Sequence, residues 1–268
     1  MDLRQALSER LDAVVLALVR AGHDPVEGVH EARKVLKQVR ALLRVLRPVM
    51  SDQARAAGVQ CRDMARSLSA SRDLQVMLDT CSQLQAEAPE SEAMDDPALM
   101  SALQQVSDHL QTRLAQDQMP DTLVLAAQMS VLRATLSGAL ASLRPGESVA
   151  LYRKQLARFE RKACKAWQHA LEDANAIGEA FHEARKRAKD WMYVMRVEQA
   201  HWSRQQKRVQ ARLKAWTETL GQINDLEVLS VHLQDMSGVD AAVVQRVLFA
   251  IDRRRARLMM QARDQAPV

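Results

Sequence analysis

Residues 29–44 read VHEARKVLKQVRALLR, and they combine the spacing of a half-buried helix with a row of cations. At roughly 100° per residue, apolar side chains such as Val35, Val39 and Leu42 gather on one side of a helix. The basic residues and the histidine fall within an arc of about 120° on the opposite side, in a row about 21 Å long. Its members are His30, Arg33, Lys34, Lys37, Arg40 and Arg44. The stretch therefore predicts an amphipathic helix with one face in a core and a cationic face opposite.

The pentapeptide HEARK occurs twice, at residues 30–34 and 182–186. Shifting the sequence by 152 residues without a gap gives 14 identities among the 50 positions from 29 to 78. Identities at one fixed offset over such a span indicate an internal duplication, and the period is far too long for a solenoid. In the second copy Met192 replaces the cation expected from Arg40. The copy otherwise repeats the row with His182, Arg185, Lys186, Lys189 and Arg196, and Tyr193 lies beside Met192.

The composition predicts an all-α fold, because Ala, Leu, Gln, Arg and Glu are abundant and the 268 residues include only eight Gly and seven Pro. We expect two related four-helix-type bundles with internal pseudo-twofold symmetry, residues 1–144 and 145–268, divided at Pro145-Gly146. An acidic loop is expected between Pro89 and Pro97. The expected helices span approximately 3–21, 26–47, 52–69, 72–86, 97–117, 121–143, 148–172, 176–200, 204–220, 224–235 and 239–264.

Several classes of protein are disfavoured. The chain has no run of 18 apolar residues and no signal-peptide pattern, so we expect a cytoplasmic protein without membrane partners. Cys61, Cys81 and Cys164 are widely separated and form no C-x-x-C motif, so neither a disulfide framework nor a zinc site is indicated. We interpret them as buried small apolar residues, and we expect no metal and no other cofactor.

Further cations accompany the two rows. In the third predicted helix of each half, Arg55 and Arg62 align with Lys207 and Lys214, and Lys154 and Arg158 lie in the helix that opens the second half. A charged helix face is usually solvated surface, but such faces mix Glu with Lys, whereas like charges four residues apart repel by a few tenths of a kcal/mol. Duplicated rows that accept this repulsion favour an anionic partner. Asp73 and Asp225 have a structural interpretation, as carboxylates in the first turn of a helix.

The paired motifs resemble those of the CHAD domain, the conserved histidine α-helical domain. The resemblance covers nearly the whole chain, and Met192 departs from it. The segments that carry the resemblance are Val29–Lys34 with Lys37 and Arg40, Arg72-Asp73-Leu74-x-Val76, Phe181–Lys186 with Lys189 and Tyr193, and Leu220-Gly221-x-x-Asn224-Asp225-Leu226. The resemblance implies two four-helix bundles related by a pseudo-twofold axis. It also implies inorganic polyphosphate as the ligand class, bound along a basic surface between the halves.

Both lines of argument lead to one expectation, a monomer that binds polyphosphate or another phosphate polyanion without catalysis and associates with polyphosphate granules. Affinity should fall steeply with salt, because released counterions drive such binding. It should rise at lower pH if His30 and His182 donate to the anion. Two alternatives stay open: a nucleic-acid-binding protein, although few aromatic side chains are present to stack on bases, and a metal-dependent polyphosphate-processing enzyme.

Overall fold

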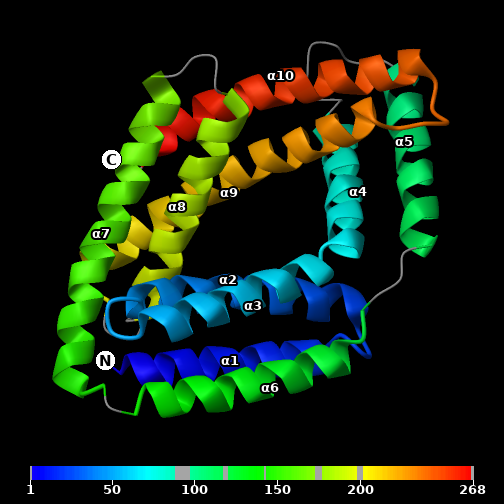
Figure 1. Cartoon of the computed structure of the whole chain (residues 1–268). Coiled ribbons are helices and arrows are strands. Elements are labelled where there is room, and N and C mark those ends of the chain that lie inside the picture. The colour runs from blue at the N-terminus through cyan, green and yellow to red at the C-terminus, as the bar shows by residue number, and fades with distance from the viewer. Residues whose placement is uncertain are drawn as a thin grey trace. The chain divides into compact units, whose positions relative to one another are not determined.

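All of the regular secondary structure in the computed structural model is helical within the residues that it describes, which are 2–87, 97–116, 120–141, 143–172, 177–197 and 202–266 (Figure 1). The all-α prediction is therefore confirmed. The acidic loop predicted between Pro89 and Pro97 lies mostly outside those ranges. The helices are α1 (Leu3–Arg20), α2 (Pro25–Leu46), α3 (Ser51–Ser67), α4 (Ala70–Glu87), α5 (Pro97–Gln116), α6 (Thr122–Ala139), α7 (Pro145–Glu172), α8 (Ile177–Met195), α9 (Arg204–Gln234) and α10 (Ala241–Gln265).

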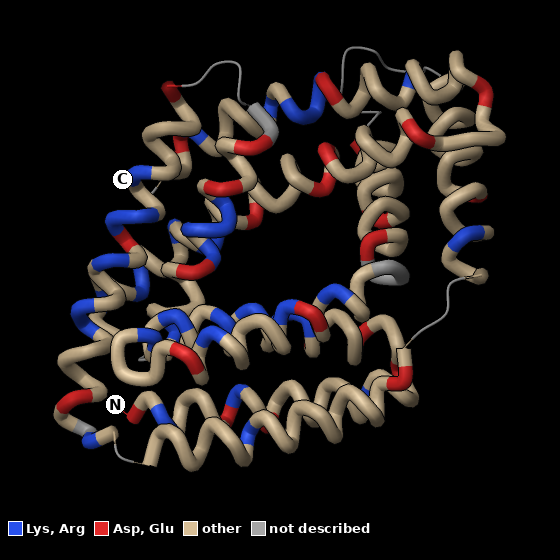
Figure 2. Tube along the Cα trace, viewed as in Figure 1, with Lys and Arg blue, Asp and Glu red and all other residues tan. Residues whose placement is uncertain are grey.

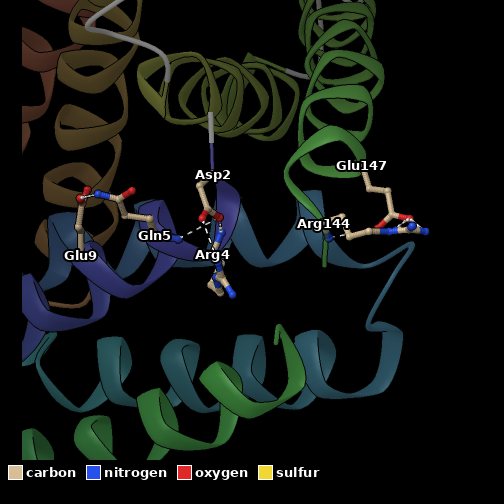
Figure 3. Close-up of polar contacts among 6 residues, drawn as sticks. All are labelled: Asp2, Arg4, Gln5, Glu9, Arg144 and Glu147. Atoms are coloured by element: carbon tan, nitrogen blue, oxygen red, sulfur yellow. Dashed lines mark hydrogen bonds and ion pairs between the residues drawn. The ribbon is translucent and has the colours of Figure 1, made fainter. Parts of the chain in front are cut away.

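Aspartate caps mark several of the predicted helix starts. The Asp2 side chain accepts hydrogen bonds from the backbone N–H groups of Arg4 and Gln5 (Figure 3), and Asp24, Asp121 and Asp240 cap α2, α6 and α10 in the same way. Each carboxylate satisfies N–H groups that have no partner within the helix. Gly238 precedes α10 with a φ of +87°, a conformation that glycine adopts without strain.

The predicted break at Asn224 is wrong, because α9 continues from Arg204 to Gln234. Leu220, Ile223 and Leu226 are buried at helical spacing through this segment. Burial of these three side chains outweighs the weak helix propensity of Gly221 and Asn224. Asp225 consequently lies in the middle of a helix, where no free N–H groups need a cap. Asp73, in contrast, lies in the first turn of α4 as expected.

The chain forms two compact units. The first comprises residues 1–72 and 119–211, and it contains α1, α2, α3, α6, α7 and α8; the second comprises residues 73–118 and 212–268, and it contains α5, α10 and most of α4 and α9. Each unit is defined by the contacts among its own residues and not by the midpoint of the sequence. The division at residue 144 follows from the proposed duplication, and both the division and the duplication remain predictions.

In the first unit α2 is the central helix, since it packs against α1, α3, α7 and α8. Its predicted apolar face is buried throughout, and Leu36, Val39 and Leu46 have no exposed surface. Gly28 allows the close approach of α1, because a Cβ at this position would lie 2.4 Å from the backbone of Ala21. Burial of the apolar face leaves the opposite face of α2 for the cations.

Two of the three cysteines are buried as expected. Cys61 and Cys81 have no exposed surface, and burial raises their thiol pKa to about 12 and about 11. Cys164 is half-buried. A thiol with so high a pKa is uncharged at neutral pH and a poor nucleophile, so Cys61 and Cys81 serve as small core side chains.

Candidate anion-binding surface

The cationic row of α2 is partly open to solvent and partly built into the unit. His30, Lys34 and Lys37 are exposed, and Arg33, Arg40 and Arg44 are half-buried. Lys34 donates to Glu31 at 2.8 Å, which is the local pairing expected on a helix surface. Figure 2 shows the basic residues gathered along α2, α3, α7 and α8. The predicted orientation of α2, with apolar side chains inward and cations outward, is correct.

Arg33 joins α2 to the end of α3. Its Nη1 donates to the carbonyl oxygen of Ala65 at 2.6 Å and also to the hydroxyl of Ser69. These two hydrogen bonds fix the position of the Arg33 guanidinium at the junction of α2 and α3. Arg33 is therefore a held cation of the row, and a planar guanidinium held in this way differs from a lysine ammonium on a flexible stem.

Arg44 forms an ion pair with Asp190 of α8. The two side chains are 22 % and 7 % exposed, so both charges are largely removed from water. Burial lowers the pKa of Arg44 and raises the pKa of Asp190, and in each case the charge of the other residue opposes the shift. The sequence predicts Arg44 as an anion-binding cation of the α2 row and gives no sign of this pairing. Asp190 is 146 residues away and aligns with Gln38 rather than with an acid in the first copy.

The row of α8 differs from that of α2. His182 and Lys186 are exposed, and Arg185, Lys189 and Arg196 are half-buried. Glu183 accepts from Lys186 at 3.4 Å and from Arg187 at 2.6 Å, so this glutamate is a local partner for cations. Lys186 and Lys34, which occupy matching positions of the two HEARK copies, thus have the same type of acidic neighbour.

Tyr193 and Met192 lie inside the unit. They are 8 % and 3 % exposed, and burial raises the pKa of the tyrosine hydroxyl. Met192 therefore lies at a position that faces the core, where burying a cation would cost free energy. Tyr193 is one of the predicted binding residues. Because its side chain is buried, a ligand can reach it less easily than it can reach the exposed histidines and lysines.

The two rows lie on neighbouring helices, because α2 contacts α8 within the first unit. The Arg44–Asp190 pair joins the C-terminal parts of the two helices. Measured along each helix axis from this pair, His30 lies about 21 Å away on α2 and His182 lies about 12 Å away on α8. The helices that carry the two rows are therefore neighbours, and the prediction that both rows bind one anion stays a prediction.

The remaining candidates are distributed over other helices. Arg55 on α3 is exposed, as are Lys154 and Arg158 on α7 and Lys207 at the start of α9, all in the first unit. Arg62 on α3 donates to Asp63 at 2.9 Å. Lys214 pairs with Glu218 at 3.8 Å and belongs to the second unit, as do Asp73 and Asp225.

Three cations that are not among the predicted binding residues lie beside this surface. Arg47, Lys162 and Arg187 line a recess of about 130 Å³ together with Arg44 and Arg158. The alignment of the two HEARK segments could not reveal them, since Arg187 aligns with Val35 and Arg47 with Gln199. Their common feature is spatial, because three different helices bring them together.

Neither a metal cluster nor a membrane span is found in the described part of the chain. No group of three or more His, Cys, Asp or Glu side chains there could hold a metal ion. No described helix combines the length and the apolar character that crossing a membrane requires.

The sequence profile of the CHAD domain matches residues 5–234, and the chain therefore belongs to the CHAD domain family. The fold agrees with solved structures. A crystal structure of the CHAD domain from the plant Ricinus communis is 20 % identical, with a TM-score of 0.63 over 97 % of this chain and 86 % of that chain. PptA from Streptomyces chartreusis is 13 % identical, with a TM-score of 0.68 over 98 % of this chain and 95 % of that one. None of the curated proteins compared with the chain matches its sequence.

Proposed function

We propose that this protein binds inorganic polyphosphate, without chemical turnover, along the cationic surface of α2 and α8. The observation that carries the proposal is the contact between these two helices, which places both HEARK rows in one compact unit. Membership of the CHAD family supports the ligand class, since the motifs of this family imply polyphosphate. The same binding would associate the protein with polyphosphate granules.

The chemistry of polyphosphate fits a long row of cations better than a shaped pocket. The polymer is a flexible chain with about one negative charge per phosphorus, so a binder needs many cations along a track. The release of counterions then supplies much of the driving force. Fixed guanidinium groups such as Arg33 can bridge neighbouring phosphate oxygens, and exposed lysines such as Lys37 add mobile charges.

The double variant Lys34→Ala/Lys186→Ala tests the surface. These lysines are 44 % and 52 % exposed and each pairs with a glutamate of its own helix, so their removal should leave the fold intact. We expect weaker binding of long-chain polyphosphate. The slope of log affinity against log salt should also become shallower by roughly 1.4 to 1.8 units, because two phosphate contacts are lost and each contributes about 0.7 to 0.9.

Arg144→Gln is the matched control. Arg144 is an exposed cation of the first unit that pairs with Glu147 at 2.8 Å (Figure 3). It precedes α7 and lies about 21 Å along that helix from Arg158. The Arg144→Gln variant should bind polyphosphate with the same affinity as the wild type. Equal affinities and equal salt slopes for both variants and the wild type would contradict the proposed surface.

Nucleic acid is the second candidate ligand, since the same cations would attract any phosphate polymer. Competition separates the two. If long-chain polyphosphate displaces a labelled oligonucleotide at equal phosphate concentration, polyphosphate is the preferred ligand. If it fails to do so, a nucleic acid is the better ligand.

We also propose that the protein does not transfer phosphoryl groups. Such chemistry on polyphosphate generally needs carboxylates that hold Mg²⁺ beside the phosphates. The two glutamates nearest the histidines in sequence, Glu31 and Glu183, pair with basic residues instead. The decisive measurement is orthophosphate release from polyphosphate with Mg²⁺ or Mn²⁺, for which we expect no release above a protein-free blank.

A further inference from the structure

The recess beside the α2 row is a compact cluster of cations. Its five basic side chains come from three segments: Arg44 and Arg47 at the end of α2, Arg158 and Lys162 on α7, and Arg187 on α8. Gln155, Phe159 and Pro48 also line it, and none of the described lining residues is a carboxylate. Gln155, Arg158 and Lys162 recur at helical spacing, so one face of α7 supplies them. We refer to this recess as the α2–α7–α8 pocket.

The charges in this pocket are only partly compensated within the protein. Asp190 neutralises Arg44, and Glu183 pairs with Arg187 at 2.6 Å. Arg47, Arg158 and Lys162 form no ion pair with a carboxylate of the described residues. Burial lowers the pKa of Lys162, and so do the charges of Arg158, Arg187, Arg44 and Arg47. The repulsion that lowers the pKa of this lysine would be relieved by an anion in the pocket.

The pocket is small, so the group that enters it is small as well. The volume of the pocket is about 130 Å³. Pockets for drug-sized ligands are larger, about 300 to 1,000 Å³. A single tetrahedral phosphate group fits a recess of this size, and the rest of a longer ligand would lie outside it.

We infer that the α2–α7–α8 pocket binds one phosphate group that carries two negative charges. Such a group is either the end of a polyphosphate chain or a small free phosphate such as pyrophosphate. A terminal phosphate has a second ionisation near pH 6 and approaches two charges at neutral pH, whereas an internal phosphate carries one. A site with several converging cations favours the group with the higher charge. The side chain of Asp190 acts here as a positioning residue, because it holds Arg44 at the pocket wall.

The position of the pocket connects it to the proposed function. Arg44 is both the last cation of the α2 row and part of the pocket lining. A chain that lies along the α2 row would thus reach the pocket with its terminal group. This last step rests on the proposed polyphosphate binding, whereas binding of free pyrophosphate does not.

The test compares two double variants of the full chain. Arg47→Ala/Lys162→Ala removes two exposed cations of the pocket, and Lys34→Ala/Lys186→Ala removes two cations of the rows. Pyrophosphate, linear tripolyphosphate and cyclic trimetaphosphate are titrated calorimetrically at fixed salt and pH 8. We expect the pocket variant to lose about tenfold or more in affinity for pyrophosphate, because charged hydrogen bonds are lost, while the row variant changes by less than about threefold.

The cyclic compound identifies the source of the phosphate, because trimetaphosphate has no terminal group. If chain ends occupy the pocket, the wild type and the row variant prefer the linear compound, and the pocket variant loses most of this preference. If the pocket variant weakens pyrophosphate binding but leaves the preference unchanged, free pyrophosphate is the ligand. Equal pyrophosphate affinity in the pocket variant and the wild type, or no pyrophosphate binding by the wild type, would overturn the inference. Polyphosphate binding that survives such a result would leave the proposed function standing.

Discussion

At the scale of single residues, the Arg44–Asp190 pair determines how the two cationic rows meet. Both side chains are mostly buried, and for both of them burial disfavours the charged form. Desolvation can cost as much as the attraction between the charges contributes, so such a pair is a weak source of stability. Its effect is to specify which parts of α2 and α8 lie together, since either charge without the other would remain unpaired in the interior.

A double-mutant cycle tests this interpretation. We expect Arg44→Leu and Asp190→Leu each to lower the free energy of unfolding by about 3 kcal/mol, because each leaves an uncompensated charge. The double variant should be clearly more stable than the sum of the two losses indicates, since it buries no charge. Urea unfolding measures all four proteins. Losses that simply add would show that the two side chains act independently.

His232 gives the second unit a dependence on pH. A side-chain N–H of Arg113 lies 3.1 Å from its Nε2, an arrangement that favours the neutral ring with Nε2 as acceptor. Burial lowers the pKa of His232, and so do the charges of Arg113 and His109, while Asp235 raises it. At a pH between the pKa of His232 in the folded chain and its higher pKa in the unfolded chain, His232 is protonated more often in the unfolded chain than in the folded chain. The neutral ring therefore contributes its full stability above about pH 6.5, and that contribution is lost as the pH falls.

The corresponding experiment compares urea midpoints at pH 8 and pH 5.5. His232→Gln keeps a side chain that can accept from Arg113 but cannot be protonated. We expect its midpoint to fall less on acidification than that of the wild type. His169→Gln, at an exposed position on α7, is the control and should behave as the wild type. The same fall in all three proteins would contradict a role for His232.

At the scale of elements, the approach of α1 to α2 depends on a glycine. A Cβ at position 28 would lie 2.4 Å from backbone atoms of Ala21 and 2.8 Å from its Cβ, and backbone cannot move aside as a flexible side chain can. We expect Gly28→Ala to lower the free energy of unfolding by about 1 to 3 kcal/mol through strain. Gly58→Ala on α3 meets no atom within 4 Å and should be neutral or stabilising. Urea unfolding of both variants provides the comparison.

The elements also show what a sequence can and cannot predict here. Helical spacing predicted α2 and its buried face correctly, because amphipathic periodicity is a local property of the chain. The break at Asn224 was predicted from the same kind of local signal, and it failed because Leu220, Ile223 and Leu226 are buried along a continuous α9. The partner of Arg44 and the lining of the α2–α7–α8 pocket depend on contacts between distant segments. No spacing within one helix reports them.

At the scale of the whole molecule, ligand binding should raise thermal stability, because the folded chain presents the rows together and the unfolded chain does not. A ligand at about one hundred times its Kd contributes about 2.7 kcal/mol. For a chain of this size we expect long-chain polyphosphate to raise the Tm by about 5 to 10 °C at low salt. The shift should shrink as the salt concentration rises, since counterion release drives binding. The Lys34→Ala/Lys186→Ala variant should show a smaller shift at the same ligand concentration, although its Tm without ligand equals that of the wild type. A shift that does not depend on salt, or one that this variant retains in full, would mean that polyphosphate stabilises the protein through some surface other than the α2 and α8 rows.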